Sequence, residues 1–310
     1  MNEWIEDFKK RAIEFLDSYG KVLVCFILVF GTFICSSLII SLVSSHKLEV
    51  SFLDIGQGDA VLITTPSGKQ MLVDGGGTNK ILEELSRHVS YFDRTINVIV
   101  ATHPDADHVT GLIPVLEKFD VSTVILSPST GHTGIYDEVE KHVRDEHAEV
   151  HIGAKGDIID FGDGVITKIL YPSKNYVEKK DDTNDASVSI VITYGDESFL
   201  LTGDLPSTRE SELIRQPLSL WPSHESRGSN VTVYKAAHHG SKYSSGEQLL
   251  SYIKPEYSVI SAGKDNRYGH PNPEALERLE KYSKEVFSTI DKGAITFMTD
   301  GKSMEIITEK

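Results

Sequence analysis

The stretch Val98-Ile-Val-Ala-Thr-His103-Pro-Asp105-Ala-Asp107-His108 is the most informative part of this sequence, because two histidines and two aspartates fall within six residues, directly after an apolar run. The run 98–101 has the composition of a buried β-strand. In an extended chain His103 and Asp105 project to the same side, whereas Asp107 and His108 follow at the turn into a helix. Four side chains that can bind a metal ion therefore converge at one strand end.

An alternative interpretation treats Asp105 or Asp107 as an ordinary helix N-cap and both histidines as loop residues. It explains any one of the four side chains, but not all of them together, because neighbouring carboxylates repel one another unless cations offset their charge. Neutral imidazole and carboxylate oxygen suit divalent zinc or manganese. We therefore predict a metal site after this strand.

Polar side chains follow three further apolar runs, each with the composition of a strand. The run 198–202 leads through Gly203 to Asp204. Asp204 or His270 alone would more often be a turn or structural residue. Recurrence at four strand ends predicts that these segments share one site. The other two runs, 231–234 and 259–262, lead to Lys235-Ala-Ala-His238-His239-Gly-Ser241-Lys242 and towards Asn266-Arg267-Tyr268-Gly-His270-Pro271.

Composition places the chain among ordinary globular proteins, with 39% hydrophobic and 25% charged residues. The net charge is −15, and because residues 1–47 hold five acidic and five basic side chains, all of it falls on residues 48–310. This argues against a basic nucleic-acid groove over much of the surface. Both cysteines, Cys25 and Cys35, precede residue 48, which excludes disulfide frameworks, zinc fingers and cysteine nucleophiles from the rest of the chain.

Residues 22–43 are 22 consecutive residues without a charge, enough for a helix to span a hydrocarbon core of roughly 30 Å. The alternatives are a cleavable signal peptide, whose apolar region is usually about 7–15 residues long, and a buried core helix, which would carry polar positions. We predict an uncleaved transmembrane anchor over residues 22–43, after a short cytoplasmic segment, residues 1–21. Four basic residues precede the run and only Lys47 follows closely, so residues 48–310 are predicted to lie outside the cytoplasm.

Short strand-like runs separated by glycine-rich turns open the region 48–310, and helix-period segments then alternate with strands. Helices are predicted over 79–90, 112–119 and 136–147. This pattern fits two packed sheets with helices outside, or a doubly wound sheet. We found no internal repeat, so one domain over residues 48–310 is expected.

Seven motifs in combination resemble the metallo-β-lactamase fold, and most closely the metallo-β-lactamase-like domain of ComEC-type DNA-uptake (competence) proteins. The resemblance implies a four-layer αββα sandwich preceded by the single anchor helix, with a dinuclear metal site along one edge between the sheets. The motifs are Asp54-Ile-Gly-Gln-Gly-Asp59-Ala, Val73-Asp74-Gly-Gly, His103-Pro-Asp-Ala-Asp-His108-Val-Thr-Gly-Leu, Asn184-Asp-Ala-Ser187, Leu200-Leu-Thr-Gly-Asp204, His238-His-Gly-Ser-Lys and Tyr268-Gly-His-Pro271.

The resemblance implies a distribution of metal ligands and neighbours. His103 and Asp105 would bind one divalent ion, Asp107, His108 and His238 the other, and Asp204 would bridge them. The choice of His238 over His239 rests on the resemblance alone. Asp59 and Asp74 are expected as structural residues near the site.

The sequence departs from the wider family where Asp105 stands in place of a histidine. A second family histidine is also absent, and the ComEC-like pattern has Asn184 and Ser187 in that neighbourhood, as expected substrate contacts. The first metal would therefore have more oxygen ligands, which shifts the choice between zinc and manganese towards manganese or partial occupancy.

Two divalent ions can activate water, so hydrolysis is the expected reaction. Asp107 is expected to orient the nucleophile as well as to bind metal. The candidates for holding a phosphate or protonating the leaving oxygen are His239, Ser241, Lys242 and His270. The alternative interpretation is that these are ordinary polar residues of a surface loop.

A phosphodiester is expected rather than a β-lactam, because Lys242, Arg267 and His270 can offset anionic charge. DNA is one such substrate, although the acidic domain does not favour it. The alternatives are an extracellular phosphoesterase acting on cell-envelope polymers, of the choline-phosphate or teichoic acid esterase type, and a non-catalytic membrane-tethered binding module that docks through residues 216–230. The expected location is the bacterial cell membrane, single-pass, with the catalytic domain outside. A part in DNA import would require a separate membrane partner, and the oligomeric state stays open.

Overall fold

A computed structural model describes residues 2–44, 47–131, 133–177, 182–216, 221 and 231–310. The chain divides into two units, 1–46 and 47–310. The segment 216–230, predicted to dock a partner in the binding-module alternative, lies mostly outside the described residues.

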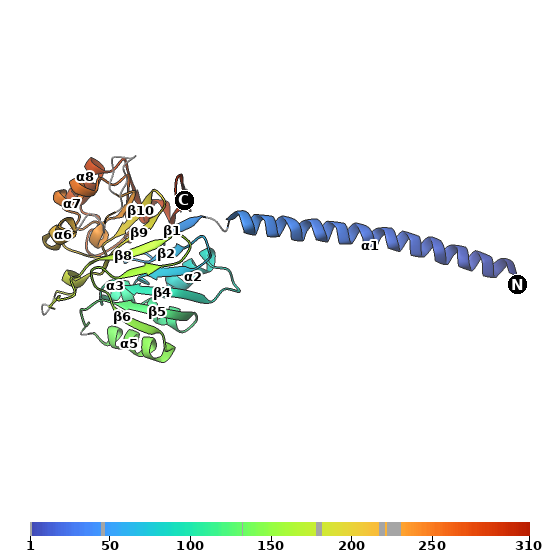
Figure 1. Ribbon diagram of the computed structural model, residues 1–310, viewed down its shortest axis with the longest axis horizontal. Helices are drawn as coiled ribbons and strands as arrows, with labels where there is room; N and C mark the ends of the chain where they lie inside the picture. Colours follow the sequence, from blue (N-terminus) through green and yellow to red (C-terminus); the bar gives the residue numbers. More distant parts are fainter. Residues whose placement is uncertain (1, 45–46, 132, 178–181, 217–220, 222–230) are drawn as a thin grey trace. The chain divides into compact units, whose positions relative to one another are not determined.

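The first unit consists of one helix, α1 (Asn2–Ser44), shown in blue in Figure 1. Within Glu3–Ser37 a window of 18 residues has a mean hydropathy of 2.0, so the helix is long and apolar enough to cross a membrane. The predicted anchor, residues 22–43, lies in this helix. The helix continues without a break through the predicted boundary at residue 21.

The first sheet of residues 47–310 has eight strands in the order β15-β14-β1-β2-β3-β4-β5-β6. Strands β1 to β3 form an antiparallel meander, and β3 to β6 run parallel. The strands are β1 (Leu48–Phe52), β2 (Val61–Thr64), β3 (Gln70–Val73), β4 (Thr95–Ala101), β5 (Asp120–Leu126), β6 (Glu149–Ile152), β14 (Ile295–Thr299) and β15 (Met304–Thr308).

The second sheet has seven strands in the order β13-β12-β11-β10-β9-β8-β7. Strands β10 to β13 run parallel, and β9 runs antiparallel to β10. The strands are β7 (Ile158–Asp160), β8 (Ile166–Tyr171), β9 (Ser189–Tyr194), β10 (Glu197–Leu201), β11 (Val233–Lys235), β12 (Tyr257–Ile260) and β13 (Glu285–Ser288).

Helices cover the outer faces of both sheets, so the predicted αββα sandwich is confirmed. One apolar core lies between the sheets, and each sheet packs its other face against helices (Figure 1). The last four residues of β4, Val98–Ala101, are buried on both faces and therefore read as one continuous apolar run. The helices are α2 (Lys80–His88), α3 (Ala106–Val109), α4 (Leu112–Leu116) and α5 (Gly134–Glu146) on the first sheet and α6 (Ser207–Ile214), α7 (Glu247–Ile253), α8 (Pro273–Tyr282) and α9 (Thr289–Lys292) with the second.

Strand polarity gathers the predicted site segments at one edge of each sheet. In the first sheet, β3 and β4 run parallel, so Asp74 and His103 follow the neighbouring carboxyl ends of these two strands. β2 runs antiparallel to β3, so Asp59, which precedes β2, lies at the same edge. In the second sheet, Asp204 and His238 follow the carboxyl ends of the parallel strands β10 and β11. Leu48, where β1 begins, pairs at the opposite end of the first sheet.

Candidate metal centre

The turn after β4 and the short helix α3 together carry the four ligands that the sequence predicts at this strand end. Asp105 occupies the N-cap position of α3, but its side chain makes no capping hydrogen bond to the described residues. Its Oδ1 instead accepts a hydrogen bond from Thr183 Oγ1 at 2.6 Å. The backbone of Asp105 therefore has the N-cap position, but its carboxylate does not cap the helix.

Asp204 lies between two groups of side chains. We call His103, Asp105 and His238 the first group. Asp204 Oδ2 is 3.9 Å from His103 Nε2 and 3.6 Å from His238 Nε2. Asp105 Oδ2 is 3.9 Å from the same His103 nitrogen. The first group thus has two imidazoles and one carboxylate, and the Asp204 carboxylate lies within 3.9 Å of both imidazoles.

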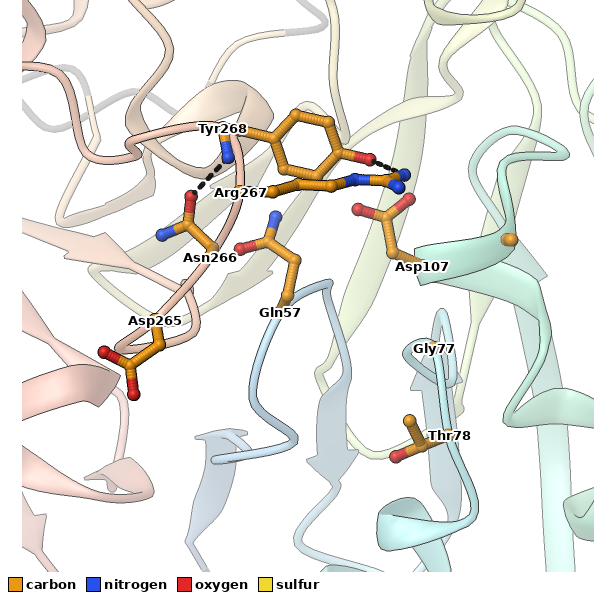
Figure 2. Close-up of a pocket in the computed structure, with 9 residues that line it drawn as sticks. Gln57, Gly77, Thr78, Asp107, Asp265, Asn266, Arg267 and Tyr268 are labelled. Atoms are coloured by element: carbon orange, nitrogen blue, oxygen red, sulfur yellow. Dashed lines mark hydrogen bonds between the residues drawn. The ribbon is translucent and has the colours of Figure 1, made fainter.

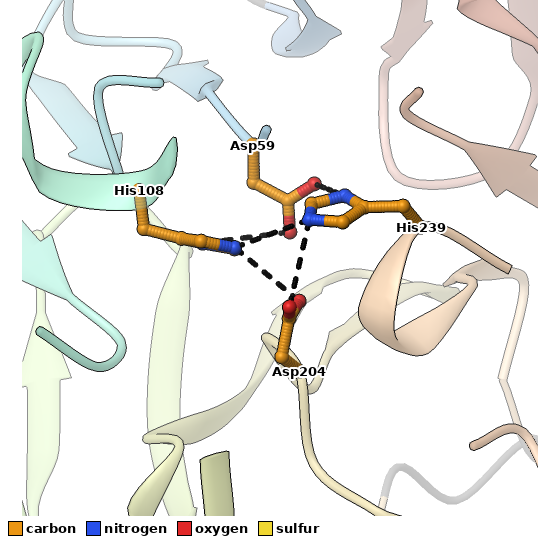
Figure 3. Close-up of side chains that lie close together, drawn as sticks. All are labelled: Asp59, His108, Asp204 and His239. Atoms are coloured by element: carbon orange, nitrogen blue, oxygen red, sulfur yellow. Dashed lines mark hydrogen bonds and ion pairs between the residues drawn. The ribbon is translucent and has the colours of Figure 1, made fainter. Parts of the chain in front are cut away.

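The second group consists of Asp107, His108 and His239. His108 Nε2 lies 3.3 Å from Asp204 Oδ1 and 3.3 Å from His239 Nε2. His239 Nε2 lies 3.4 Å from Asp107 Oδ2 and 3.5 Å from Asp204 Oδ2. Figure 3 shows the two imidazoles and the Asp204 carboxylate converging. Asp204 thus contacts both groups, as a bridging ligand must.

His239, and not His238, stands in the second group, which differs from the ligand set implied by the resemblance. The reason is the backbone of η3 (Ala237–Gly240), where both residues have left-handed φ angles, 51° and 54°, uncommon for non-glycine residues. The two ring planes lie 83° apart. Both imidazoles reach Asp204 Oδ2, but His239 is 1% exposed and also contacts Asp107 and His108, whereas the His238 side chain is 30% exposed.

Asp74 lies on the side of His108 that faces away from the centre, and it orients the imidazole. The sequence predicts Asp74 as a structural residue near the site. Its Oδ2 accepts hydrogen bonds from His108 Nδ1 at 2.8 Å and from Thr102 Oγ1 at 2.7 Å. A carboxylate only accepts, so the imidazole donates through Nδ1 and presents Nε2 to the centre.

Asp59 lies behind His239, whose Nδ1 donates a hydrogen bond to the carbonyl oxygen of Ser261 at 3.0 Å. Asp59 Oδ1 lies 3.1 Å from His239 Nδ1, and its Oδ2 forms an ion pair with the buried Lys235. Asp59 is close enough to join a cluster with His108, Asp204 and His239. It faces the Nδ1 atoms, however, so we place it behind the ligands. Sequence reasoning missed the role of Lys235; its only signal was a lysine directly after the apolar run 231–234.

Gly58 lets the Asp59 loop reach this position. Its φ of 119° is a conformation that L side chains rarely adopt, and a Cβ there would lie 2.0 Å from the carbonyl oxygen of Asp107. The next residue's amide, Asp59 N, donates to that same oxygen at 3.3 Å. A side chain at position 58 would therefore push the two loops of the centre apart.

The centre fits divalent cations by its charges and its donors. His103 Nε2 is buried and has no hydrogen-bond partner among the described residues. Burial alone would lower the pKa of His108, but the carboxylates of Asp204 and Asp74 outweigh it and raise that pKa well above its ordinary value. Burial would raise the pKa of Asp204, but the imidazoles of His239 and His108 hold it well below its usual range. Bound cations would take the place of the imidazole protons.

Two residues predicted to contact substrate are buried in the structure. Ser187 is fully buried, and its Oγ accepts a hydrogen bond from Asp204 N at 3.2 Å, so it supports the backbone of that aspartate. Ser241 is also buried, and its Oγ accepts from Tyr243 N at 3.3 Å within its own turn. Asn184, in η1 (Asn184–Ala186), is half-buried, with its Oδ1 unpartnered among the described side chains.

The remaining predicted contacts lie at the rim. Lys242 is exposed, with its ammonium group over the Tyr243 ring. The His270 ring lies 5.3 Å from that of His238 and 6.4 Å from that of His239, between centroids. Burial, and then the positive charge of these two histidines, lower the pKa of His270 to about 4.

A pocket of about 460 Å³ opens beside Asp107 (Figure 2). Figure 2 shows the Arg267 guanidinium on the side of the pocket where Asp107 lies. Arg267 and Tyr268 come from the loop between β12 and α8, and sequence reasoning gave Tyr268 no role. The lining residues are Gln57, Gly77, Thr78, Ala106, Asp107, Asp265, Asn266, Arg267 and Tyr268.

In a comparison with known protein families, residues 53–264 match the family model of the Metallo-beta-lactamase superfamily. The chain is similar to ComE operon protein 3 of Bacillus subtilis, with 27% identity over 82% of this chain and 33% of that protein. It is also similar to Recombination protein 2 of Haemophilus influenzae, with 28% identity over 90% of this chain and 31% of that protein. The chain thus spans about a third of the length of these curated relatives. Among solved structures, CmlA, a diiron beta-hydroxylase from Streptomyces venezuelae, has 13% identity and a TM-score of 0.48 over 77% of this chain and 52% of that chain.

Proposed function

Because this chain belongs to the metallo-beta-lactamase superfamily, we propose that it is a metal-dependent phosphodiesterase or nuclease held at a bacterial membrane by α1. The observation that supports this best is the contact of one buried carboxylate, that of Asp204, with two groups of imidazoles and carboxylates. Two cations bound to such a set would lie close enough to act on one phosphate.

The chain's own residues would divide between two cations. The first group, His103, Asp105 and His238, would hold one, the second group, Asp107, His108 and His239, the other, and Asp204 would contact both. When bound, a pair of divalent cations lowers the pKa of water towards 7 and offsets negative charge on the phosphate oxygens. The oxygen-rich first group is expected to accept manganese as readily as zinc.

Hydrolysis also needs groups that move protons. The attacking water's oxygen forms a bond to phosphorus, the bond from phosphorus to the leaving oxygen breaks, and the water's proton passes to a base. Asp107, with a carboxylate at the pocket wall, would orient that water and accept its proton. His270, at the rim, would donate a hydrogen bond from its neutral imidazole to the leaving oxygen.

The relatives' names favour a nucleic acid as the substrate. Two of them carry competence-related names, ComE operon protein 3 and Competence protein ComA of Neisseria gonorrhoeae. By analogy, the substrate of this chain would be DNA, and a separate membrane partner would carry out any transport. The basic residues before residue 22 would keep the N-terminus in the cytoplasm and the catalytic domain outside.

The test uses the full chain purified in detergent and loaded with Mn²⁺ or Zn²⁺. We expect turnover of single-stranded DNA and of bis(p-nitrophenyl) phosphate, and loss of both with Asp204→Ala. Phosphocholine esters provide a comparison, because their faster turnover would favour the envelope-polymer alternative. Stoichiometric metal binding without turnover of any phosphodiester would overturn the proposal, and the absence of bound metal would favour the binding-module alternative.

A further inference from the structure

We infer that Arg267 and Tyr268 form a platform that holds one nucleoside of a single-stranded nucleic acid beside the reacting phosphate. The inference deepens the proposed phosphodiesterase function and rests on it. It assigns a substrate class to the pocket next to the metal centre, and it predicts that simple phosphodiesters, which lack a base, are poorer substrates.

The pocket has the size and place that this role requires. Its volume of about 460 Å³ falls within the range of roughly 300–1,000 Å³ that is usual for small-ligand sites. Asp107 forms part of its wall and also belongs to the second group, 3.4 Å from His239 Nε2. A molecule that fills the pocket therefore lies directly beside the atoms that would bind metal.

Arg267 and Tyr268 pack against each other and place a cationic and an aromatic group together at the pocket. Arg267 donates a hydrogen bond to Tyr268 Oη at 2.6 Å, and its guanidinium carbon lies 4.9 Å from the Tyr268 ring centroid. The Tyr268 ring is also stacked on His270, with an angle of 22° between the planes. Aromatic rings and guanidinium planes are the groups on which unpaired bases stack in proteins that bind single strands.

The platform is exposed but held in place. Tyr268 is 47% exposed, so its side chain is accessible from solvent. Asn266 fixes the loop, because its side chain donates to Gly263 O at 2.8 Å and accepts from Tyr268 N at 3.1 Å and His270 N at 2.9 Å. A rigid platform orders fewer groups when it binds, which favours affinity.

The charge of the chain explains why stacking would matter here. The net charge of −15 lies on residues 48–310, so the domain offers no broad positive field to attract a duplex backbone. Short-range contacts to one exposed base and its phosphate suit such a surface. Bases inside a duplex are already stacked and paired, so they cannot reach the platform.

The experiment compares two esters with the same leaving group in the full chain. The substrates are thymidine 5′-(p-nitrophenyl) phosphate, which carries a base, and methyl p-nitrophenyl phosphate, which does not. We expect Tyr268→Ala to lower kcat/KM for the nucleoside ester by about 5- to 150-fold, the usual range for loss of one stacked base, and to change the methyl ester less than about twofold. Tyr91→Ala, which removes an 80% exposed tyrosine outside the pocket, is the matched control and should change neither.

Arg267→Gln provides a second, independent readout. Loss of one phosphate contact to a single strand should reduce the slope of log affinity against log salt by about 0.7. Affinity for fluorescent oligothymidylate and oligouridylate, measured by anisotropy in the full chain, distinguishes DNA from RNA. Metal content must match the wild type in every variant.

The outcomes separate this inference from the function on which it rests. An equal loss on both esters with Tyr268→Ala, or no loss on either, overturns the platform. If the wild type cleaves neither ester, the phosphodiesterase proposal fails, and the affinity for oligonucleotides then tests the platform alone. Weaker oligonucleotide binding by Tyr268→Ala supports the platform, and unchanged binding overturns it.

Discussion

Replacing Lys235 with methionine tests whether the ion pair beneath the centre holds it together. Lys235 is 1% exposed and pairs with Asp59, which is 2% exposed. Burial would raise the pKa of Asp59, but Lys235 and then His239 outweigh it and lower that pKa. Without the lysine, the carboxylate stays buried beside fewer positive charges. Breaking one side of a buried pair costs about 3–5 kcal/mol, and we expect Lys235→Met to lower the free energy of unfolding by that amount.

The sign of the pH dependence follows from the lowered pKa. The stability that the ionised Asp59 contributes is present above the unfolded pKa of 3.8 and is lost as pH falls through the lower folded pKa. Lys235→Met raises the folded pKa, so the variant should be closest to the wild type in acid and furthest from it near pH 7.

The assay is urea unfolding of the full chain in detergent with EDTA, followed by the fluorescence of Trp221, which is buried in the core of the second sheet. A Trp4→Phe background removes the other tryptophan of the sequence. The double variant with Asp59→Asn should recover at least about 2 kcal/mol of the loss, because it removes the uncompensated charge. A loss under 1 kcal/mol for Lys235→Met at pH 7, or additive effects in the double variant, would refute the reasoning.

Three further predictions concern the centre and its surroundings. Asp74→Asn should weaken Zn²⁺ or Mn²⁺ binding by about 10- to 100-fold, measured by calorimetry, because the hydrogen bond that orients His108 is altered; unchanged affinity would contradict it. His239→Ala should lose more bound metal than His238→Ala when both are dialysed against the same chelator, since only His239 is fully buried, and the reverse order would restore the ligand set implied by the resemblance. Burial raises the pKa of Glu210 to about 7, so the free energy of unfolding of the wild type falls as pH rises from about 4.5 to 7. By urea unfolding, Glu210→Gln should be more stable than the wild type by up to about 3 kcal/mol at pH 8, with little gain at pH 4.5. An equal difference at both pH values would count against this prediction.

The fold and most of the centre could be predicted from the sequence because the signals are local. An apolar run followed at once by His103, Asp105, Asp107 and His108 marks a strand end, and parallel strands bring such ends to one edge. The αββα sandwich and the resemblance to ComEC-type domains are confirmed. The helix boundaries shifted, since the predicted helix over 112–119 ends at Leu116.

The rest depends on contacts between distant segments. The choice between His238 and His239 follows from two consecutive left-handed residues, which no periodicity reports. The buried Lys235 pairs with Asp59, which lies far away in the sequence. The resemblance places Ser187 among the substrate contacts, whereas in the structure its Oγ accepts a hydrogen bond from the amide of Asp204. Residues that support a site are selected by tertiary packing, so their spacing carries no pattern.

The polarity of β1 has a practical use. The polypeptide enters the first sheet at Leu48, and the metal-binding edge lies at the other end of the same strand, beyond Phe52. A purification tag, fluorescent protein or surface linker joined ahead of Leu48 would start from the end of the sheet remote from the reacting groups. Immobilisation through that end should therefore leave long polymeric substrates free to approach.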